Sequence, residues 1–177
     1  WAGVPLCGTP RDLPMRGGWS PDGPLVRVEF LRESRDKRIT LVLGGRFPLV
    51  PSLWCFMAVG TLMEARARLA LREGISAHRI NLDIGAWSQG DAEVPTIPGL
   101  AAWTAAAGVS HVVWTALAPK FGGQAGRVPT VDEVLLHLDG LAGAERDVAE
   151  QYVRRTPRQV DTVYRRAIEA RLGWTAR

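Results

Sequence analysis

The sequence lacks an apolar run long enough to cross a membrane, and it shows no secretion signal at its start. A spanning helix needs about 18 consecutive apolar residues, whereas the longest apolar stretch, 47–62, is interrupted by Pro48, Pro51 and Gly60. No basic segment followed by an apolar one stands at the beginning. Because the chain begins at Trp1 and not at a methionine, we expect further residues upstream. We expect no membrane partner.

Cysteine is scarce. Cys7 and Cys55 are too few for a disulfide framework and lack the spacing of a metal site. We interpret them as buried thiols of a cytoplasmic protein; a single disulfide between them is the alternative if the compartment is oxidising.

Motifs for metals and cofactors are missing too. The three histidines stand apart, without the HxH or HExxH spacing that would favour zinc, and we interpret them as structural. No dinucleotide fingerprint is present, and the glycines at 122, 123 and 126 are not followed by the GK[ST] of a phosphate-binding loop. We therefore predict no metal and no cofactor. The histidines are His78, His111 and His137.

Lysine is nearly absent, with Lys37 and Lys120 the only two among 22 basic residues. The net charge of +4 therefore comes from arginine, which is as typical of a GC-rich, bacterial-like coding sequence as of selection for a partner. The basic residues alternate with acids, as in 32–38, a pattern typical of a solvated surface. We do not expect a nucleic-acid partner.

What the chain does contain predicts a mixed α/β domain. A length of 177 residues with 46% apolar residues suits one globular domain. We assign it to 25–177, preceded by an irregular arm over 1–24, rich in proline and glycine, that packs on the body. Alternating segments predict an antiparallel hairpin of strands over 25–31 and 38–43, with a third strand near 52–57. A capping box at Thr61 and Glu64 starts a helix that ends at Gly74.

The second half predicts a βαβ unit followed by helices, all packed on one mixed sheet. A strand over 79–84, a helix over 98–107 and a strand over 111–117 would form a right-handed unit whose two strands are parallel. Thr130 and Glu133 form another capping box for a helix to Gly140, and 144–155 predicts the next helix. For the last helix, Thr156 is the expected N-cap, with Pro157 at the first helical position.

The candidate site follows from this parallel arrangement. In open α/β sheets, ligands bind at the carboxyl ends of parallel strands, where the loops after 79–84 and 111–117 would meet. Lys120 and Arg127 would anchor an anion, and an aspartate would act as general acid or base. The predicted catalytic residues are Asp83, Asp91 and Lys120; the predicted ligand-binding residues are Trp87, Ser88, Trp114, Thr115, Arg127, Tyr152 and Arg155. The alternative is a solvated loop whose glycines serve only tight turns.

A second cluster lies on the last two helices. Its arginines and tyrosines would close over the anion site or bind an acidic protein partner; acids at helical spacing also allow a solvated face held by salt bridges. The sequence thus predicts a binding protein for a small anionic ligand, an enzyme of hydrolase or transferase type, and leaves a non-catalytic interaction domain as the alternative. This Arg/Tyr face comprises Tyr152, Arg154, Arg155, Arg158, Tyr164, Arg165 and Arg166.

Overall fold

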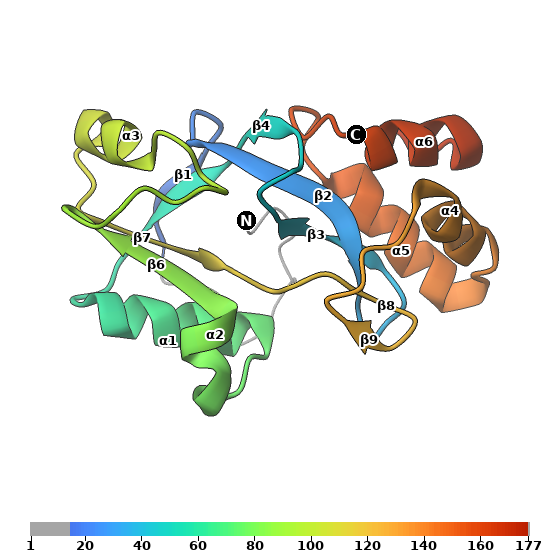
Figure 1. The fold of residues 1–177 in the computed structure, drawn as a ribbon, viewed down its shortest axis with the longest axis horizontal. Coiled ribbons are helices and arrows are strands. Elements are labelled where there is room, and N and C mark those ends of the chain that lie inside the picture. The colour runs from blue at the N-terminus through green and yellow to red at the C-terminus, as the bar shows by residue number, and fades with distance from the viewer. Residues whose placement is uncertain (1–14, 177) are drawn as a thin grey trace. The chain divides into compact units, whose positions relative to one another are not determined.

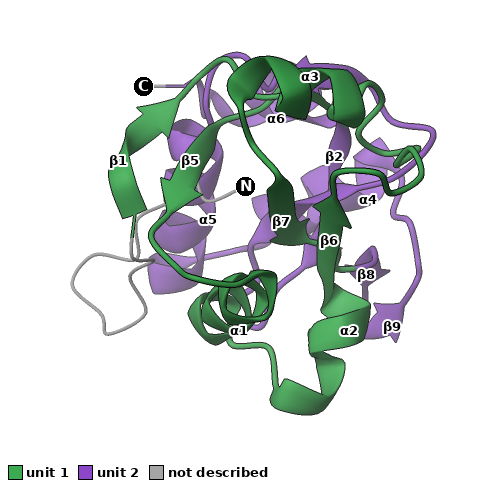
Figure 2. Cartoon of the chain, turned by 90° about the vertical axis from the view of Figure 1, so that its left-hand side faces the viewer, with its two compact units in different colours: residues 1–26, 51–117 green, residues 27–50, 118–177 purple. Residues whose placement is uncertain are grey.

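The computed structural model describes residues 15–176 and has the mixed α and β content that the sequence predicts (Figure 1). The chain divides into two compact units that interleave along the sequence (Figure 2). Unit 1 comprises Trp1–Val26 and Pro51–Leu117, and unit 2 comprises Arg27–Val50 and Ala118–Arg177. Within the described residues, no helix has the length and apolar character needed to span a bilayer.

The described part of unit 1 contains two antiparallel ribbons and three α-helices. The first ribbon pairs β1 with β5, and the second pairs β6 with β7. Figure 1 shows α1 beside the second ribbon, which it contacts along both strands. The elements are β1 Met15–Ser20, β5 Trp54–Met57, α1 Leu62–Glu73, the 3-10 turn η1 Ala77–Arg79, α2 Ile80–Asp83, β6 Ile84–Ser88, α3 Leu100–Ala107 and β7 His111–Thr115.

The β1–β5 ribbon corrects the prediction of an irregular arm over 1–24. Within the predicted arm, Met15–Ser20 is a strand that lies antiparallel to β5, with Met15 opposite Met57. Residues 1–14 lie outside the described part of the chain. The predicted third strand is confirmed, but it does not extend the hairpin as a meander. Beside it, the indole of Trp54 packs edge-on against Trp103, with ring centroids 5.0 Å apart.

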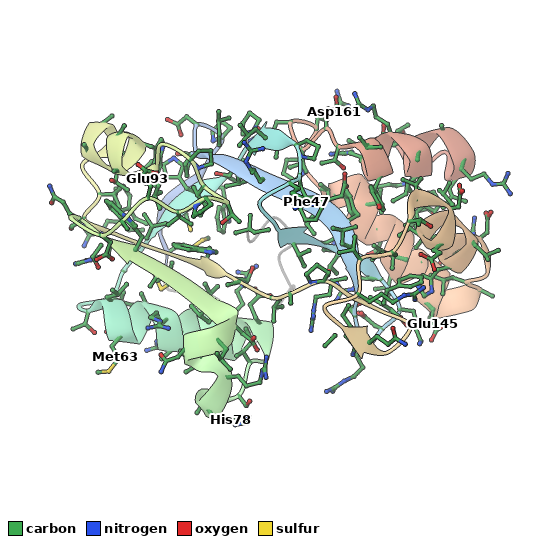
Figure 3. The ribbon with its side chains drawn as sticks, viewed as in Figure 1. Phe47, Met63, His78, Glu93, Glu145 and Asp161 are labelled. Atoms are coloured by element: carbon green, nitrogen blue, oxygen red, sulfur yellow. The ribbon has the colours of Figure 1, made fainter. Side chains whose placement is uncertain are left out.

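Helix α1 begins and ends where the sequence predicts. The Thr61 hydroxyl accepts the N–H of Glu64 at 3.1 Å, while the Glu64 carboxylate accepts the N–H of Gly60 at 3.2 Å. Gly74 adopts the left-handed conformation, φ 67°, that ends the helix. One face is buried, and Leu69 and Ala70 pack against Ile84 in the core of the unit. On the opposite face Met63 projects from the helix and is 79% exposed (Figure 3).

The predicted parallel βαβ unit is wrong. Residues 79–83 are helical, and the strand begins only at Ile84. It then runs antiparallel to β7, with Ile84 opposite Thr115 and Ser88 opposite His111. The alternation of 79–84 fits a helical turn as well, and this turn is stabilised by an ion pair between Arg79 and Asp83, four residues apart.

Unit 2 is built on a mixed five-stranded sheet. β2 pairs antiparallel with β3, which confirms the predicted hairpin, and parallel with β8. The described strands therefore form three separate sheets, not the single mixed sheet that was predicted. The elements that lie wholly or mostly in unit 2 are β2 Leu25–Glu33, β3 Ile39–Leu43, β4 Leu49–Pro51, β8 Lys120–Phe121, β9 Gln124–Ala125, α4 Val131–Asp139, α5 Gly143–Arg155 and α6 Val163–Leu172.

The C-terminal helices are confirmed except for the start of the last one. Both halves of the Thr130–Glu133 capping box are formed at α4. Thr156 does not cap α6: its hydroxyl donates to the Tyr152 carbonyl at 2.9 Å and lies at the end of α5. The segment after it stays non-helical because the buried guanidinium of Arg165 binds its carbonyls, and α6 starts at Val163 with Thr162 as the N-cap. The carbonyls bound by Arg165 are those of Thr156, Pro157 and Val160.

A buried acid joins α6 to β2. Glu29 is only 2% exposed, and its carboxylate accepts the Thr162 hydroxyl at 2.5 Å and the Phe30 N–H at 2.9 Å. The N–H of Tyr164 in the first turn of α6 is a third donor at 3.4 Å. Burial raises the pKa of Glu29 against the effect of these hydrogen bonds. The carboxylate thus complements the positive end of the helix dipole.

Candidate functional site

The predicted site residues are distributed over both units. Unit 1 holds the residues from the loops around β6 and β7, and unit 2 holds the remaining cations and Tyr152. Because β6 and β7 are antiparallel, their carboxyl ends lie at opposite ends of the ribbon. The shared strand edge on which the site was predicted therefore does not exist. The residues in unit 1 are Asp83, Trp87, Ser88, Asp91, Trp114 and Thr115, and those in unit 2 are Lys120, Arg127, Tyr152 and Arg155.

At one end of the β6–β7 ribbon, the contacts of Asp83 have a structural role. It is 7% exposed, and its two oxygens accept hydrogen bonds from Arg79 at 2.6 and 2.8 Å. Its carbonyl accepts the N–H of Ala116 at 2.7 Å, just beyond Thr115. Nearby, the ring of Trp114 lies over Gly85, where a Cβ atom would approach it to 2.2 Å. These contacts hold α2 and the ribbon together.

At the other end, a serine and a histidine share a hydrogen bond. Ser88 Oγ lies 3.0 Å from His111 Nδ1, directly across the two strands. Asp91 accepts the backbone N–H of Ser88 at 2.8 Å, and buried Trp87 donates to the Ala92 carbonyl at 3.2 Å, so both shape the loop that follows.

The Ser88–His111 pair has the residue types of a nucleophile and its base. A triad would also need an acid on the second ring nitrogen of His111, and no residue in 15–176 provides one. His111 was interpreted as structural from the sequence, and only the strand register brings it to Ser88.

In unit 2, the loop around Lys120 is bound by its own surroundings. Arg127 pairs with Glu133 and lies over the ring of Phe121, 5.1 Å from its centroid. The backbone N–H of Gly122 donates to Glu33 at 2.9 Å, so this glycine N–H already has an acceptor. Lys120 is half-buried, and its ammonium makes no hydrogen bond or ion pair with residues 15–176.

The electrostatics of this loop follow from the same contacts. The hydrogen bond from Lys37 is the largest cause of the lowered pKa of Glu33. The backbone N–H of Thr130 lowers the pKa of Glu133, and the charge of Arg127 adds to this effect. Both acids are therefore held in the ionised form that these contacts require.

The Arg/Tyr face is largely directed inward. Tyr152 is 7% exposed, and its hydroxyl accepts the N–H of Leu41 at 3.1 Å. Tyr164 donates to the Pro129 carbonyl at 2.7 Å, and Arg154 donates to carbonyls just after α6. Arg165 is buried in the turn described above. The exposed members of this face are Arg155, Arg158 and Arg166, of which Arg166 pairs with Asp161 at 3.5 Å.

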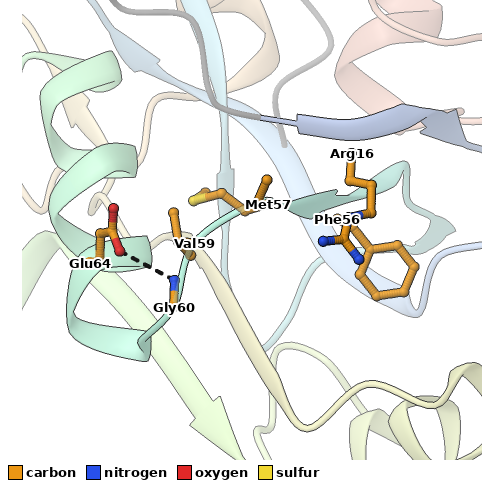
Figure 4. A pocket seen from close by; sticks show the side chains of 7 residues that line it. Arg16, Phe56, Met57, Val59, Gly60 and Glu64 are labelled. Carbon is orange, nitrogen blue, oxygen red and sulfur yellow. Dashed lines mark hydrogen bonds between the residues drawn. The ribbon is translucent and has the colours of Figure 1, made fainter.

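A hollow of about 530 Å³ opens in unit 1 beside the β1–β5 ribbon (Figure 4). Arg16 on β1 stands opposite Phe56 on β5 in the strand register. The Arg16 guanidinium is exposed and makes no hydrogen bond or ion pair with any other residue of 15–176. The residues that line the hollow are Arg16, Phe56, Met57, Ala58, Val59, Gly60 and Glu64.

Sequence reasoning missed this hollow because its two sides are far apart in the chain. Arg16 precedes Gly17 and Gly18, and a short glycine-rich segment predicts a loop more readily than a strand. The pairing with β5 also shifts register between Arg16 and Ser20. The only local signal was an apolar run with Phe56 at its centre, directly before the Thr61 cap.

No family model, curated protein or solved structure matches this chain. Among the described residues, no group of three or more histidines, cysteines or acids is placed to hold a metal ion. The chemistry of the side chains is therefore the basis for any function.

Proposed function

We propose that the chain binds a small organic anion in the hollow beside the β1–β5 ribbon. The observation that supports this proposal is an arginine without an acidic partner among residues 15–176, placed at the rim of a hollow whose mixed lining includes Phe56, Met57 and Val59. Pockets for small ligands have volumes of about 300–1,000 Å³, and a hollow of about 530 Å³ falls within that range.

The lining suggests how a ligand would be held. A guanidinium presents two parallel N–H groups that match a carboxylate, and the guanidinium of Arg16, which lines the hollow, makes no hydrogen bond within residues 15–176. Phe56, Met57 and Val59 form the apolar part of the wall, with Phe56 46% exposed and the other two half-buried. A carboxylate with an apolar body of a few carbons fits this combination better than a free phosphate does.

The proposal is limited to binding. The hydrolase or transferase hypothesis assigned acid–base roles to Asp83 and Asp91, whose carboxylates already accept hydrogen bonds from Arg79 and from the Ser88 backbone. The alternative of an acidic protein partner retains only the exposed Arg155, Arg158 and Arg166 of the Arg/Tyr face. A guanidinium beside a hollow, without a partner among residues 15–176, is the stronger support, so we propose that the ligand lies at Arg16.

The test is a thermal-shift and calorimetric titration with hexanoate and phenylacetate on the wild type and single variants. A ligand at a hundred times its dissociation constant adds about 2.7 kcal/mol to the stability, which is readily measured. Arg16→Ala should weaken binding by roughly five- to tenfold, and Arg16→Lys should weaken it less.

Two matched controls separate this site from the sites predicted by sequence. Arg155→Ala removes another exposed arginine and should leave affinity unchanged, as should Lys120→Ala. If Lys120→Ala or Arg155→Ala abolishes binding while Arg16→Ala does not, the ligand occupies a site in unit 2 and the proposal is wrong. Absence of binding by either acid at millimolar concentration would also overturn it.

A further inference from the structure

The hollow carries charges of opposite sign at its two ends. Figure 4 shows Arg16 and Phe56 at one end and Glu64 at the other, with Met57 and Val59 between them. Arg16 comes from β1, whereas Glu64 comes from the first turn of α1. A ligand that reaches from one end to the other therefore meets the cation Arg16, then Met57 and Val59, and then the anion Glu64.

Glu64 has acceptor capacity left after its contacts within unit 1. One oxygen accepts the Gly60 N–H at 3.2 Å, and the other lies 3.8 Å from the guanidinium of Arg68. An ionised carboxylate has about four lone-pair positions, so these two contacts do not saturate it. Glu64 and Arg68 are both about half exposed, with side chains 43% and 52% accessible, and the pair between them is correspondingly weak.

The start of α1 does not offer an alternative anion site at this end. The N–H of Gly60 is bound by Glu64, and the N–H of Glu64 is bound by the Thr61 hydroxyl. The Glu64 carboxylate also places a negative charge in the first turn, where it offsets the helix dipole. A second carboxylate on the ligand would meet this charge and be repelled.

We infer that the ligand is a zwitterion with its two charges at opposite ends of a short apolar chain, of the ω-amino acid class. This inference rests on the proposed function, because it takes the acid group of the ligand to lie at Arg16. The carboxylate binds Arg16, the methylene chain packs along Met57 and Val59, and the ammonium group donates to Glu64.

The experiment compares aminohexanoate, hexanoate and adipate on the wild type and on Glu64→Gln by isothermal titration. Glutamine keeps an acceptor for the Gly60 N–H but loses the charge. The wild type should bind aminohexanoate roughly two- to fivefold more tightly than Glu64→Gln does, while hexanoate should bind both equally. Adipate should gain affinity in Glu64→Gln, since the repulsion is removed. Asp147→Asn, which neutralises an exposed acid of α5, is the matched control and should change none of these affinities.

The outcomes separate the inference from the proposed function. If hexanoate binds and loses affinity in Arg16→Ala, but Glu64→Gln changes neither aminohexanoate nor adipate binding, the function holds and the zwitterion inference is wrong. If none of the three ligands binds, both are wrong. A drop for aminohexanoate in Glu64→Gln together with a gain for adipate supports the inference, and far-UV circular dichroism of the variant confirms that α1 is intact.

Discussion

Thr162→Val should destabilise unit 2 far more than the loss of an ordinary helix cap. The Thr162 hydroxyl has two roles: it accepts the N–H of Arg165 at 3.3 Å as the cap of α6, and it donates to buried Glu29 at 2.5 Å. Loss of a cap costs about 1 kcal/mol, and loss of a hydrogen bond to a buried charge costs about 1.5–3 kcal/mol. Valine has the same shape and cannot replace either bond, so we expect a loss of about 2.5–4 kcal/mol in the free energy of unfolding.

Urea unfolding measures this loss, with Thr61→Val as the matched control. Thr61 caps α1 through the N–H of Glu64 in the same way, but it is exposed and donates to no buried acid. We expect about 1 kcal/mol for Thr61→Val and, with a slope of about 2 kcal/mol per M, a fall in midpoint of about 1.2–2 M for Thr162→Val. If Thr162→Val costs no more than Thr61→Val, the Glu29–Thr162 bond contributes nothing, and the account of the α6 junction is refuted.

Three further predictions concern Glu29, Gly85 and Arg165. The folded pKa of Glu29 is raised above its ordinary value of 4.5 by burial, so its contribution to stability is fully present below that value and is lost as pH rises through the folded pKa. The wild type should therefore gain stability on acidification across this window, and urea unfolding at several pH values should show a smaller gain for Glu29→Gln. Gly85→Ala should cost about 1–3 kcal/mol, since its Cβ would lie 2.2 Å from the Trp114 ring; unchanged Trp fluorescence and an unchanged unfolding midpoint would contradict this contact. Arg165→Met should cost about 2–4 kcal/mol, because it removes the guanidinium donor from the carbonyls of Thr156 and Val160. A cost below that of an exposed Arg158→Met would show that the turn is held by other contacts.

The helices could be predicted because the signals that start and stop them are local. Thr61 with Gly74, and Thr130 with Glu133, act within a few residues of themselves, and each has the predicted conformation or hydrogen bond. The hairpin of β2 and β3 was accessible for the same reason, since its turn closes by a hydrogen bond between Ser34 and Arg38.

Strand partners and directions could not be predicted, because alternation indicates a strand without indicating what lies beside it. The sequences of 84–88 and 111–115 do not distinguish a parallel from an antiparallel pair, and the connection between the two strands is long enough for both. The predicted helix start at Thr156 was wrong for a related reason. Thr156 and Pro157 have good local chemistry for a helix start, but a buried arginine eight residues beyond Pro157 binds the carbonyls of the turn.

The prediction of the candidate site was affected most, because it depended on strand partners and directions. Asp83 and Lys120 were placed together only by the assumed strand direction, whereas the hollow depends on Arg16 and Phe56 meeting across a ribbon. Residue types alone led to the prediction of an anion site, whereas the site proposed at Arg16 depends on the register of β1 and β5.

The buried bond between Glu29 and Thr162 also sets the order in which this chain can mature on the ribosome. The two residues are 133 positions apart, and at about 5–20 residues per second the threonine is added roughly 7–27 s after the glutamate. Until Thr162 is synthesised, the Glu29 carboxylate on β2 lacks this donor, and its burial without it is unfavourable. We expect the nascent sheet of unit 2 to stay open on that side until α6 is synthesised, so the last helix closes the unit instead of being added to a finished one.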